Sequence, residues 1–257
     1  MASPAGEPVQ AQPGTGVRFD WGAAGAASLA RVCAVLVVVD VLSFTTAVDV
    51  AVGRGIRVHP FPWGAQAAAY ADRLGAALAV GRSAMSAARP YSLSPKALAR
   101  APYVPDLVLP SPNGAAICAA AGVSGVPVVA GCVRNADAVA AWLRRHGYGS
   151  AARPVGVVAA GERWPDGALR PCVADLVGAG IVLDGLVAAP GGLSVEAAVA
   201  LAAVDALPDL PAAVRGCVSG QELTGYGFGG DVDAAVRRGA STLVPVLRDG
   251  AFTAAVA

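Results

Sequence analysis

An apolar run that ends in a carboxylate and a hydroxyl-rich turn constrains this chain more than any other feature. Residues 35–39 read Val-Leu-Val-Val-Val, and the turn after them carries Asp40, Ser43, Thr45 and Thr46. Branched residues at odd and even positions predict a central strand that helices cover on both faces. Open α/β sheets bind ligands at the carboxyl ends of their strands, and a helix start offers free N–H groups. The turn is therefore a candidate anion site, with a plain helix cap as the alternative reading of Asp40.

Strand and helix patterns alternate along the rest of the chain. Short apolar runs predict further strands at residues 56–61, 77–80, 106–109, 126–130 and 154–159. Helices are predicted at residues 64–74, 113–121, 136–146, 194–214 with a break at Pro208, and 232–238, and another helix begins near Pro171. Residues 243–254 are expected to form a closing hairpin, and the proline-rich segment 81–105 a loop or lid with one short helix. The alternation of predicted strands and helices indicates an α/β fold.

The composition favours a small-molecule partner. Lys and Arg total 19 against 18 for Asp and Glu, so the net charge of +1 gives no reason to expect nucleic acid or an anionic membrane.

No apolar run reaches the roughly 18 residues that a membrane span needs. Residues 1–16 lack the charged start of a secretory signal, so we expect a disordered leader before a single domain at residues 17–257. Five cysteines without a Cys-x-x-Cys pair favour a reducing, cytoplasmic setting.

Polar side chains follow several of the predicted strands at the point where each strand ends. They are Asp40, Asn113, Arg134 with Asn135, and Glu162. Carboxylates gathered at one sheet edge suit a hard divalent cation such as magnesium, which prefers oxygen ligands and can bridge to a phosphate. Backbone N–H groups at Asn113–Gly114 and at Ser43–Thr46 can cradle phosphate oxygens, and Arg134 can neutralise their charge. The pattern indicates phosphoryl transfer or hydrolysis.

Several competing chemistries lack their motif. The single lysine, Lys96, precedes an alanine, which excludes the phosphate loop of nucleotide hydrolases. The turn at Asp40–Thr46 contains no glycine, which argues against a dinucleotide site. Leu42 stands where phosphoaspartate phosphatases commonly carry a second Asp, and Arg134 follows Cys132 too closely for a cysteine-dependent phosphatase. Neither route through a covalent phosphoenzyme is supported.

Eight short motifs, in order, resemble the 2-phosphosulfolactate phosphatase family. They are Asp40-Val41-Leu42-x-x-Thr45-Thr46, Ser94-Pro95, Asn113-Gly114, Arg134-Asn135-Ala136, Ala160-Gly161-Glu162, Asp175-Leu176-x-x-Ala179-Gly180, Ser219-Gly220-x-Glu222-Leu223 and the segment from Val244 to Gly250. Each motif is weak alone, but their order and spacing are hard to obtain by chance. The resemblance runs from about Val35 to Phe252.

The resemblance implies a three-layer α/β/α sandwich with a central, mostly parallel or mixed sheet, and a magnesium-dependent phosphatase. The family's reaction removes phosphate from 2-phospho-3-sulfolactate on the route to coenzyme M. Related phosphorylated 2-hydroxy acids are expected substrates, and a homodimer is left open. Asp40, Glu162 and Asp175 are the implied catalytic and metal-binding carboxylates. The implied substrate-binding residues are Ser43, Thr45, Thr46, Asn113, Gly114, Arg134 and Asn135.

The chain also departs from the family pattern. Relatives usually carry an Arg where this chain has Ser43, so one side chain that could bind an anionic group of the substrate is missing. Acidic residues are replaced at Arg82 and Ala174. Two hypotheses follow. Either Arg82, Arg134 or Arg163 replaces the missing cation in an active phosphatase, or the chain is a diverged, non-catalytic relative that binds an acidic metabolite.

Overall fold

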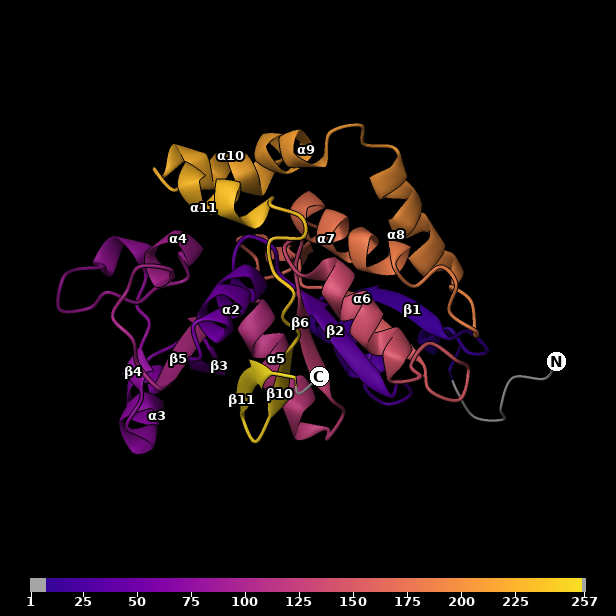
Figure 1. Cartoon of the computed structure of the whole chain (residues 1–257), viewed down its shortest axis with the longest axis horizontal. Coiled ribbons are helices and arrows are strands. Elements are labelled where there is room, and N and C mark those ends of the chain that lie inside the picture. Colours follow the sequence, from indigo (N-terminus) through magenta and orange to yellow (C-terminus); the bar gives the residue numbers. More distant parts are fainter. Residues whose placement is uncertain (1–7, 256–257) are drawn as a thin grey trace.

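A nine-stranded mixed sheet forms the centre of the computed structural model, which describes residues 8–255 (Figure 1). In chain order its strands are β1 (Val17–Trp21), β2 (Val35–Val39), β3 (Arg57–Pro62), β4 (Ala77–Leu78), β5 (Asp106–Ser111), β6 (Val128–Gly131), β7 (Val155–Ala159), β10 (Pro245–Arg248) and β11 (Ala251–Ala254). Their order in space is β1-β7-β2-β6-β10-β11-β3-β5-β4. The predicted closing hairpin, β10 with β11, pairs antiparallel with β6 on one side and with β3 on the other. It therefore joins two blocks of parallel strands.

Helices cover both faces of the sheet, which confirms the three-layer α/β/α architecture. One apolar core forms with α1 (Gly22–Leu29), α2 (Phe44–Gly53) and α5 (Gly114–Val123). The core on the opposite face forms with α6 (Ala136–Arg145), α7 (Val173–Asp184) and α8 (Val195–Asp205). The remaining helices are α3 (Gln66–Leu74), α4 (Pro95–Leu98), α9 (Leu210–Gly216), α10 (Val218–Gly225) and α11 (Gly229–Ala235). Figure 1 shows α9, α10 and α11 together near one end of the sheet, where α11 packs beside α4.

Strand β2 shows how the sequence builds these two cores. Val35, Val37 and Val39 belong to the core that includes α6 and α7, whereas Leu36 and Val38 belong to the core that includes α1, α2 and α5. All five residues are fully buried. Because successive strand residues point to opposite faces, a strand covered on both sides must be apolar throughout. The predicted central strand is confirmed, and its neighbours β7 and β6 run parallel to it.

Two parts of the N-terminal region differ from the sequence prediction. β1 and α1 were not predicted, because Arg18 and Asp20 interrupt the apolar pattern of β1. Arg18 is nevertheless only 1% exposed, and its guanidinium donates a hydrogen bond to the Ala11 carbonyl (2.8 Å). Within the expected disordered leader, Val9–Ala11 form a 3-10 turn with Ala11 fully buried, so that part is ordered. Residues 1–7 lie outside the described residues.

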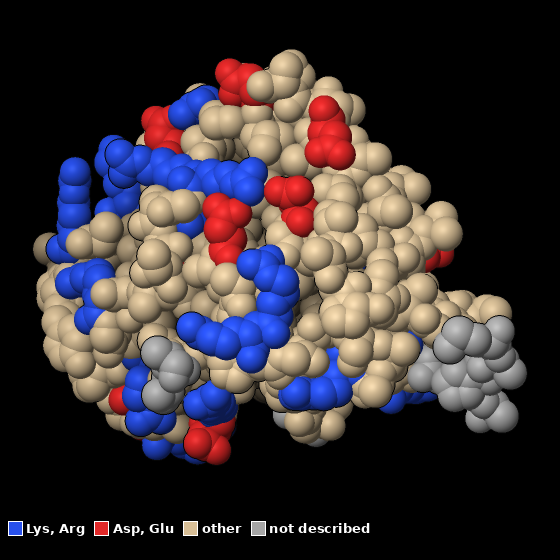
Figure 2. All heavy atoms as spheres, turned by 45° about the vertical axis from the view of Figure 1, so that its right-hand side comes forward, with Lys and Arg blue, Asp and Glu red and all other residues tan. Residues whose placement is uncertain are grey.

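The surface carries charge of both signs. On the face shown in Figure 2, Lys and Arg side chains lie mostly toward one side, with Asp and Glu among them and a broad uncharged area beside them. Among residues 8–255, no single helix has the length and apolar composition to cross a membrane. Helices α8 and α9 have that length and apolar composition only when they are taken together, and the chain bends by 97° between them.

Candidate active site

Three carboxylates come together where β2 and β7 end. Asp40 follows β2, and Glu162 begins the short strand β8 (Glu162–Arg163), which follows β7 and pairs with β9 (Leu169–Arg170). Asp175 lies in the first turn of α7. Because β2 and β7 are parallel neighbours, their carboxyl ends adjoin. Burial and, second, the charge of Asp40 raise the pKa of both Glu162 and Asp175, so the three carboxylates form one electrostatic group.

Backbone N–H groups hold the Asp40 carboxylate in place. Asp40 Oδ2 accepts a hydrogen bond from Gly114 N (2.9 Å), and Oδ1 accepts one from Phe44 N at the start of α2 (3.3 Å). A Cβ atom at position 114 would lie 2.5 Å from Oδ2, so only glycine permits this approach. Burial raises the pKa of Asp40, and these two hydrogen bonds oppose the rise. The turn after β5 thus delivers Gly114 N to the Asp40 carboxylate, whereas the sequence pattern predicted this N–H group as a ligand of substrate phosphate.

The hydroxyls of Thr45 and Thr46 face the protein rather than open space. Thr45 Oγ1 donates to the Asp40 carbonyl and Thr46 Oγ1 to the Val41 carbonyl, each at 2.8 Å. Both side chains are fully buried. They therefore fix the backbone between β2 and α2. Sequence reasoning proposed them as substrate ligands because a hydroxyl-rich turn has the same signature in either role.

Asp175 ties the ends of β2 and β7 together. Its Oδ1 accepts a hydrogen bond from Val41 N (2.8 Å) and its Oδ2 accepts one from Gly161 N (2.9 Å). Gly161 has a positive φ of 67°, a conformation that glycine adopts without strain. The side chain of Asp175 is 3% exposed, and burial followed by the charge of Asp40 raises its pKa well above the ordinary range. Asp175 therefore links the backbone after β2 to the backbone after β7 through two buried hydrogen bonds, and it is also a member of the carboxylate group.

Glu162 is the most accessible of the three carboxylates. Its Oε2 accepts a hydrogen bond from Asn113 Nδ2 (2.9 Å), and both residues line a cavity of about 270 Å³. Burial, then the charge of Asp40, raises the pKa of Glu162 to about 7. A carboxyl group that titrates near neutral pH can take up or release a proton during a reaction.

An arginine from the segment between β4 and α4 reaches the turn after β2. Arg82 Nη2 donates to the Ser43 hydroxyl (2.5 Å), and Arg82 Nε pairs with Asp231 on α11 (3.1 Å). Asp231 is 2% exposed, and its second oxygen accepts a hydrogen bond from Ser94 Oγ (2.6 Å). The positive charge of Arg82 opposes the rise in the pKa of Asp40. Arg82, Arg134 and Arg163 were the candidates to replace the anion-binding arginine that relatives carry at the position of Ser43. Of these three, Arg82 is the one that contacts Ser43.

Arg134 and Asn135 make other contacts. Arg134 Nε pairs with Asp49 on α2 (2.8 Å), and its Nη1 donates to the Ala234 carbonyl on α11 (3.1 Å). Asn135 is fully buried and hydrogen-bonds the backbone of Cys132 and of Ala130, which fixes the turn between β6 and α6. The structure thus does not bring these two side chains to the carboxylate group. The third cation, Arg163, donates to the Gly167 carbonyl (3.2 Å) beside Glu162 in the β8–β9 hairpin.

The carboxylates of this site can be compared with the ligands that a metal ion needs. Among residues 8–255, no three His, Cys, Asp or Glu side chains are arranged to hold a metal ion together. Asp40 and Asp175 each accept backbone hydrogen bonds on both oxygens, but Asp40 is 6% exposed against 3% for Asp175, so Asp40 and Glu162 are the more accessible pair. A pair is sufficient for magnesium, which usually keeps several waters and binds one or two carboxylates together with a substrate phosphate. The fit is therefore to a two-carboxylate site rather than to the predicted set of three.

Cys132 and Cys172 do not supply a nucleophile. Burial raises the pKa of Cys132 and of Cys172 to about 12, which keeps both thiols neutral near pH 7. A neutral, buried thiol is a poor nucleophile. Both side chains are buried and act as small packing groups.

Comparison with known families assigns the chain. A sequence model of the family described as 2-phosphosulpholactate phosphatase matches residues 25–250, which include every residue of the carboxylate group. A search of curated proteins finds no match. The chain therefore belongs to the 2-phosphosulpholactate phosphatase family, and its family makes it a phosphoric monoester hydrolase.

Proposed function

We propose that the protein is a magnesium-dependent phosphatase that hydrolyses the phosphate ester of a small 2-hydroxy acid such as 2-phosphosulfolactate. The observation that carries this proposal is the pairing of Asp40 and Glu162 with the Asn113–Gly114 turn. Family membership supplies the reaction class. The cavity beside Glu162, about 270 Å³, suits a small molecule.

Asp40 and Glu162 would hold the magnesium ion. Burial and their mutual repulsion disfavour two negative charges here, and a divalent cation would relieve that repulsion. When bound, magnesium would polarise the phosphoryl oxygens. Asp175 would act indirectly, because it fixes the backbone of Val41 and Gly161 next to the two ligands.

Arg82 would bind an anionic group of the substrate. A phosphorylated 2-hydroxy acid carries a phosphate and at least one further acid group, so a second positive centre is needed beside the metal. The guanidinium of Arg82 is fixed by Asp231 and Ser43, and its side chain remains 17% exposed. A pre-positioned guanidinium presents several N–H donors to a carboxylate, sulfonate or phosphate.

Glu162 would also orient the attacking water. As a magnesium ligand its carboxylate would be ionised, and an ionised carboxylate oxygen accepts a hydrogen bond from water. In the metal-free protein its pKa of about 7 allows both protonation states near neutral pH. The hydrogen bond from Asn113 Nδ2 holds its carboxylate at the cavity wall.

A phosphate-release assay tests the proposal. We expect the protein to release phosphate from at least one of 2-phosphosulfolactate, phospholactate and phosphoglycolate in magnesium buffer. Chelation with EDTA is expected to lower the rate about 100-fold or more, because a Lewis-acid metal contributes several kcal/mol to phosphoryl transfer. Calorimetric binding of a phospho-acid without any hydrolysis would instead support the non-catalytic hypothesis.

Glu162→Gln is expected to change how the metal-free protein responds to pH. Folding raises the pKa of Glu162 from 4.5 to about 7, so its ionised form is disfavoured in the fold and wild-type stability falls as the pH rises through that interval. Glutamine keeps the acceptor for Asn113 and carries no charge. The variant should therefore gain about 2 kcal/mol over the wild type between pH 5 and pH 8, or roughly 5 °C in Tm.

Thermal unfolding in EDTA at both pH values measures this difference. Glu196→Gln, at an exposed position in the first turn of α8, is the matched control and should show no such pH-dependent gain. A gain at pH 8 no larger than that of the control would show that Glu162 is not destabilised by ionisation.

A further inference from the structure

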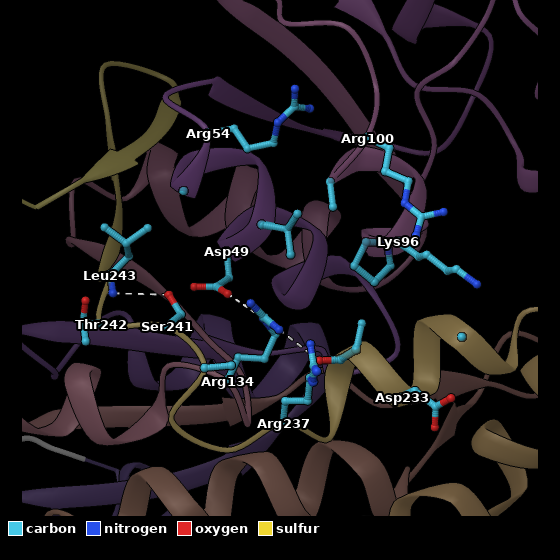
Figure 3. Close-up of a pocket in the computed structure, with 17 residues that line it drawn as sticks. Asp49, Arg54, Lys96, Arg100, Arg134, Asp233, Arg237, Ser241, Thr242 and Leu243 are labelled. Carbon is cyan, nitrogen blue, oxygen red and sulfur yellow. Dashed lines mark hydrogen bonds and ion pairs between the residues drawn. The ribbon is translucent and has the colours of Figure 1, made fainter.

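A second hollow lies apart from the carboxylate group. It measures about 730 Å³, and its walls come from α2, α4, α11, the turn after β6 and residues 240–243 (Figure 3). Neither Asp40 nor Glu162 lines it. The volume falls in the range of small-molecule sites in proteins. None of the 17 residues that line it is aromatic, so it offers no ring on which a nucleotide base could stack.

Positive charge dominates the lining of this hollow. Five cations, Arg54, Lys96, Arg100, Arg134 and Arg237, face two carboxylates, Asp49 and Asp233. Asp49 is paired with Arg134, and Asp233 is paired with Arg215, which does not belong to the lining. Within residues 8–255, Lys96, Arg100 and Arg237 form no ion pair. Their uncompensated charge will attract anions.

The cations come from two different walls. Lys96 belongs to α4 and Arg100 follows it closely, whereas Arg237 lies just after α11, and Figure 3 shows it on the other side of the hollow from Arg100. Arg54 is held at the upper wall by hydrogen bonds to the carbonyls of Leu98 and Ala101. A molecule with two anionic groups can contact both walls at once.

A buried acceptor at the lining is the second, independent indication of a ligand. Asp49 is 1% exposed, and its Oδ2 accepts the hydrogen bond from Arg134 Nε (2.8 Å). Its Oδ1 is buried and has no hydrogen-bond partner among the described residues. Buried charged acceptors are normally satisfied, so a donor that enters the hollow would complete this one. A hydroxyl group supplies such a donor.

We propose that this hollow binds a small, non-aromatic molecule with two phosphate groups and at least one hydroxyl, the chemistry of a sugar bisphosphate. Its phosphates would contact Lys96 and Arg100 on one wall and Arg237 on the other, and its hydroxyl would donate to Asp49 Oδ1. This site is separate from the phosphatase site and does not depend on the function proposed for it.

Isothermal titration calorimetry with fructose 1,6-bisphosphate tests the site. The full chain is titrated at low salt in magnesium-free buffer. We expect one saturable site, and we expect the double variant Arg100→Gln/Arg237→Gln to weaken binding about 10-fold or more, as loss of two charge-assisted contacts does. Arg248→Gln, which removes an exposed arginine outside the hollow, and Arg163→Gln, which removes an exposed arginine beside Glu162, should leave the Kd within about twofold.

Three results would overturn the proposal. The first is no saturable binding of fructose 1,6-bisphosphate, and the second is an affinity that the double variant leaves unchanged. The third is a loss in Arg163→Gln or Arg248→Gln equal to that in the double variant, which would place binding at the phosphatase site or make it unspecific. Pyrophosphate, which lacks the sugar hydroxyls, is expected to bind several-fold more weakly, and equal affinity would remove Asp49 from the site.

Discussion

Asp40→Asn is expected to lower the turnover of phosphate release about 100-fold or more while the chain stays folded. Asparagine has nearly the same shape and keeps one oxygen for the hydrogen bond from Gly114 N, but it removes the negative charge that would bind the metal. The loss of charge also lowers the repulsion on Glu162 and Asp175, so the thermal stability should not fall in proportion to the activity. Steady-state phosphate release and circular dichroism on the same samples measure both quantities.

Asp205→Asn is the matched control for this experiment. It makes the same chemical change at an exposed position at the end of α8, away from the carboxylate group. Its turnover should equal that of the wild type. If Asp40→Asn retained normal turnover in saturating magnesium, Asp40 would have no part in the reaction.

Asp175→Ala is expected to destabilise the protein by about 3 kcal/mol, or roughly 6–12 °C in Tm. The change leaves the N–H groups of Val41 and Gly161 buried without an acceptor, and each such group costs about 1–3 kcal/mol. Relief of the repulsion from Asp40 offsets a part of that loss. Thermal and urea unfolding at pH 7 measure the effect.

Asp184→Ala removes a half-exposed carboxylate from the other end of the same helix and is expected to cost less than about 1 kcal/mol. A Tm for Asp175→Ala as high as that of this control would show that the hydrogen bonds of Asp175 to Val41 N and Gly161 N do not stabilise the fold. Turnover that recovers fully in Asp175→Asn, which retains an acceptor oxygen, would further assign the residue a positioning role rather than a metal-binding one.

Local sequence patterns predicted the elements that depend on local chemistry. The apolar run of β2 and the carboxylate after it follow from burial on two faces, and the positions of Asp40, Glu162 and Asn113 follow from the rule that parallel strands end at one edge. The same rule failed for Arg134, which also follows a strand. Its side chain turns to Asp49, 85 positions earlier, and no local pattern encodes that choice.

Contacts between distant segments escaped prediction for the same reason. Arg82 and Asp231 are 149 positions apart, and only the packing of α11 beside α4 makes them partners. β1 was missed because its register is set by pairing with β7, far along the chain, rather than by a clean alternation of its own residues. The position of the β10–β11 hairpin within the sheet is equally non-local, although the hairpin itself was predicted from the sequence.

The central position of that hairpin has a consequence for how the protein is made. The carboxylates Asp40, Glu162 and Asp175 follow the parallel block that contains β2 and β7, whereas Gly114 and Arg82 follow strands of the block that contains β5 and β4. The two blocks share no strand pairing until residues 245–254 lie between them. During synthesis on the ribosome each block can fold early, since domains form as their segments emerge. The sheet that unites the two halves of the candidate active site is completed only after β11 has been translated.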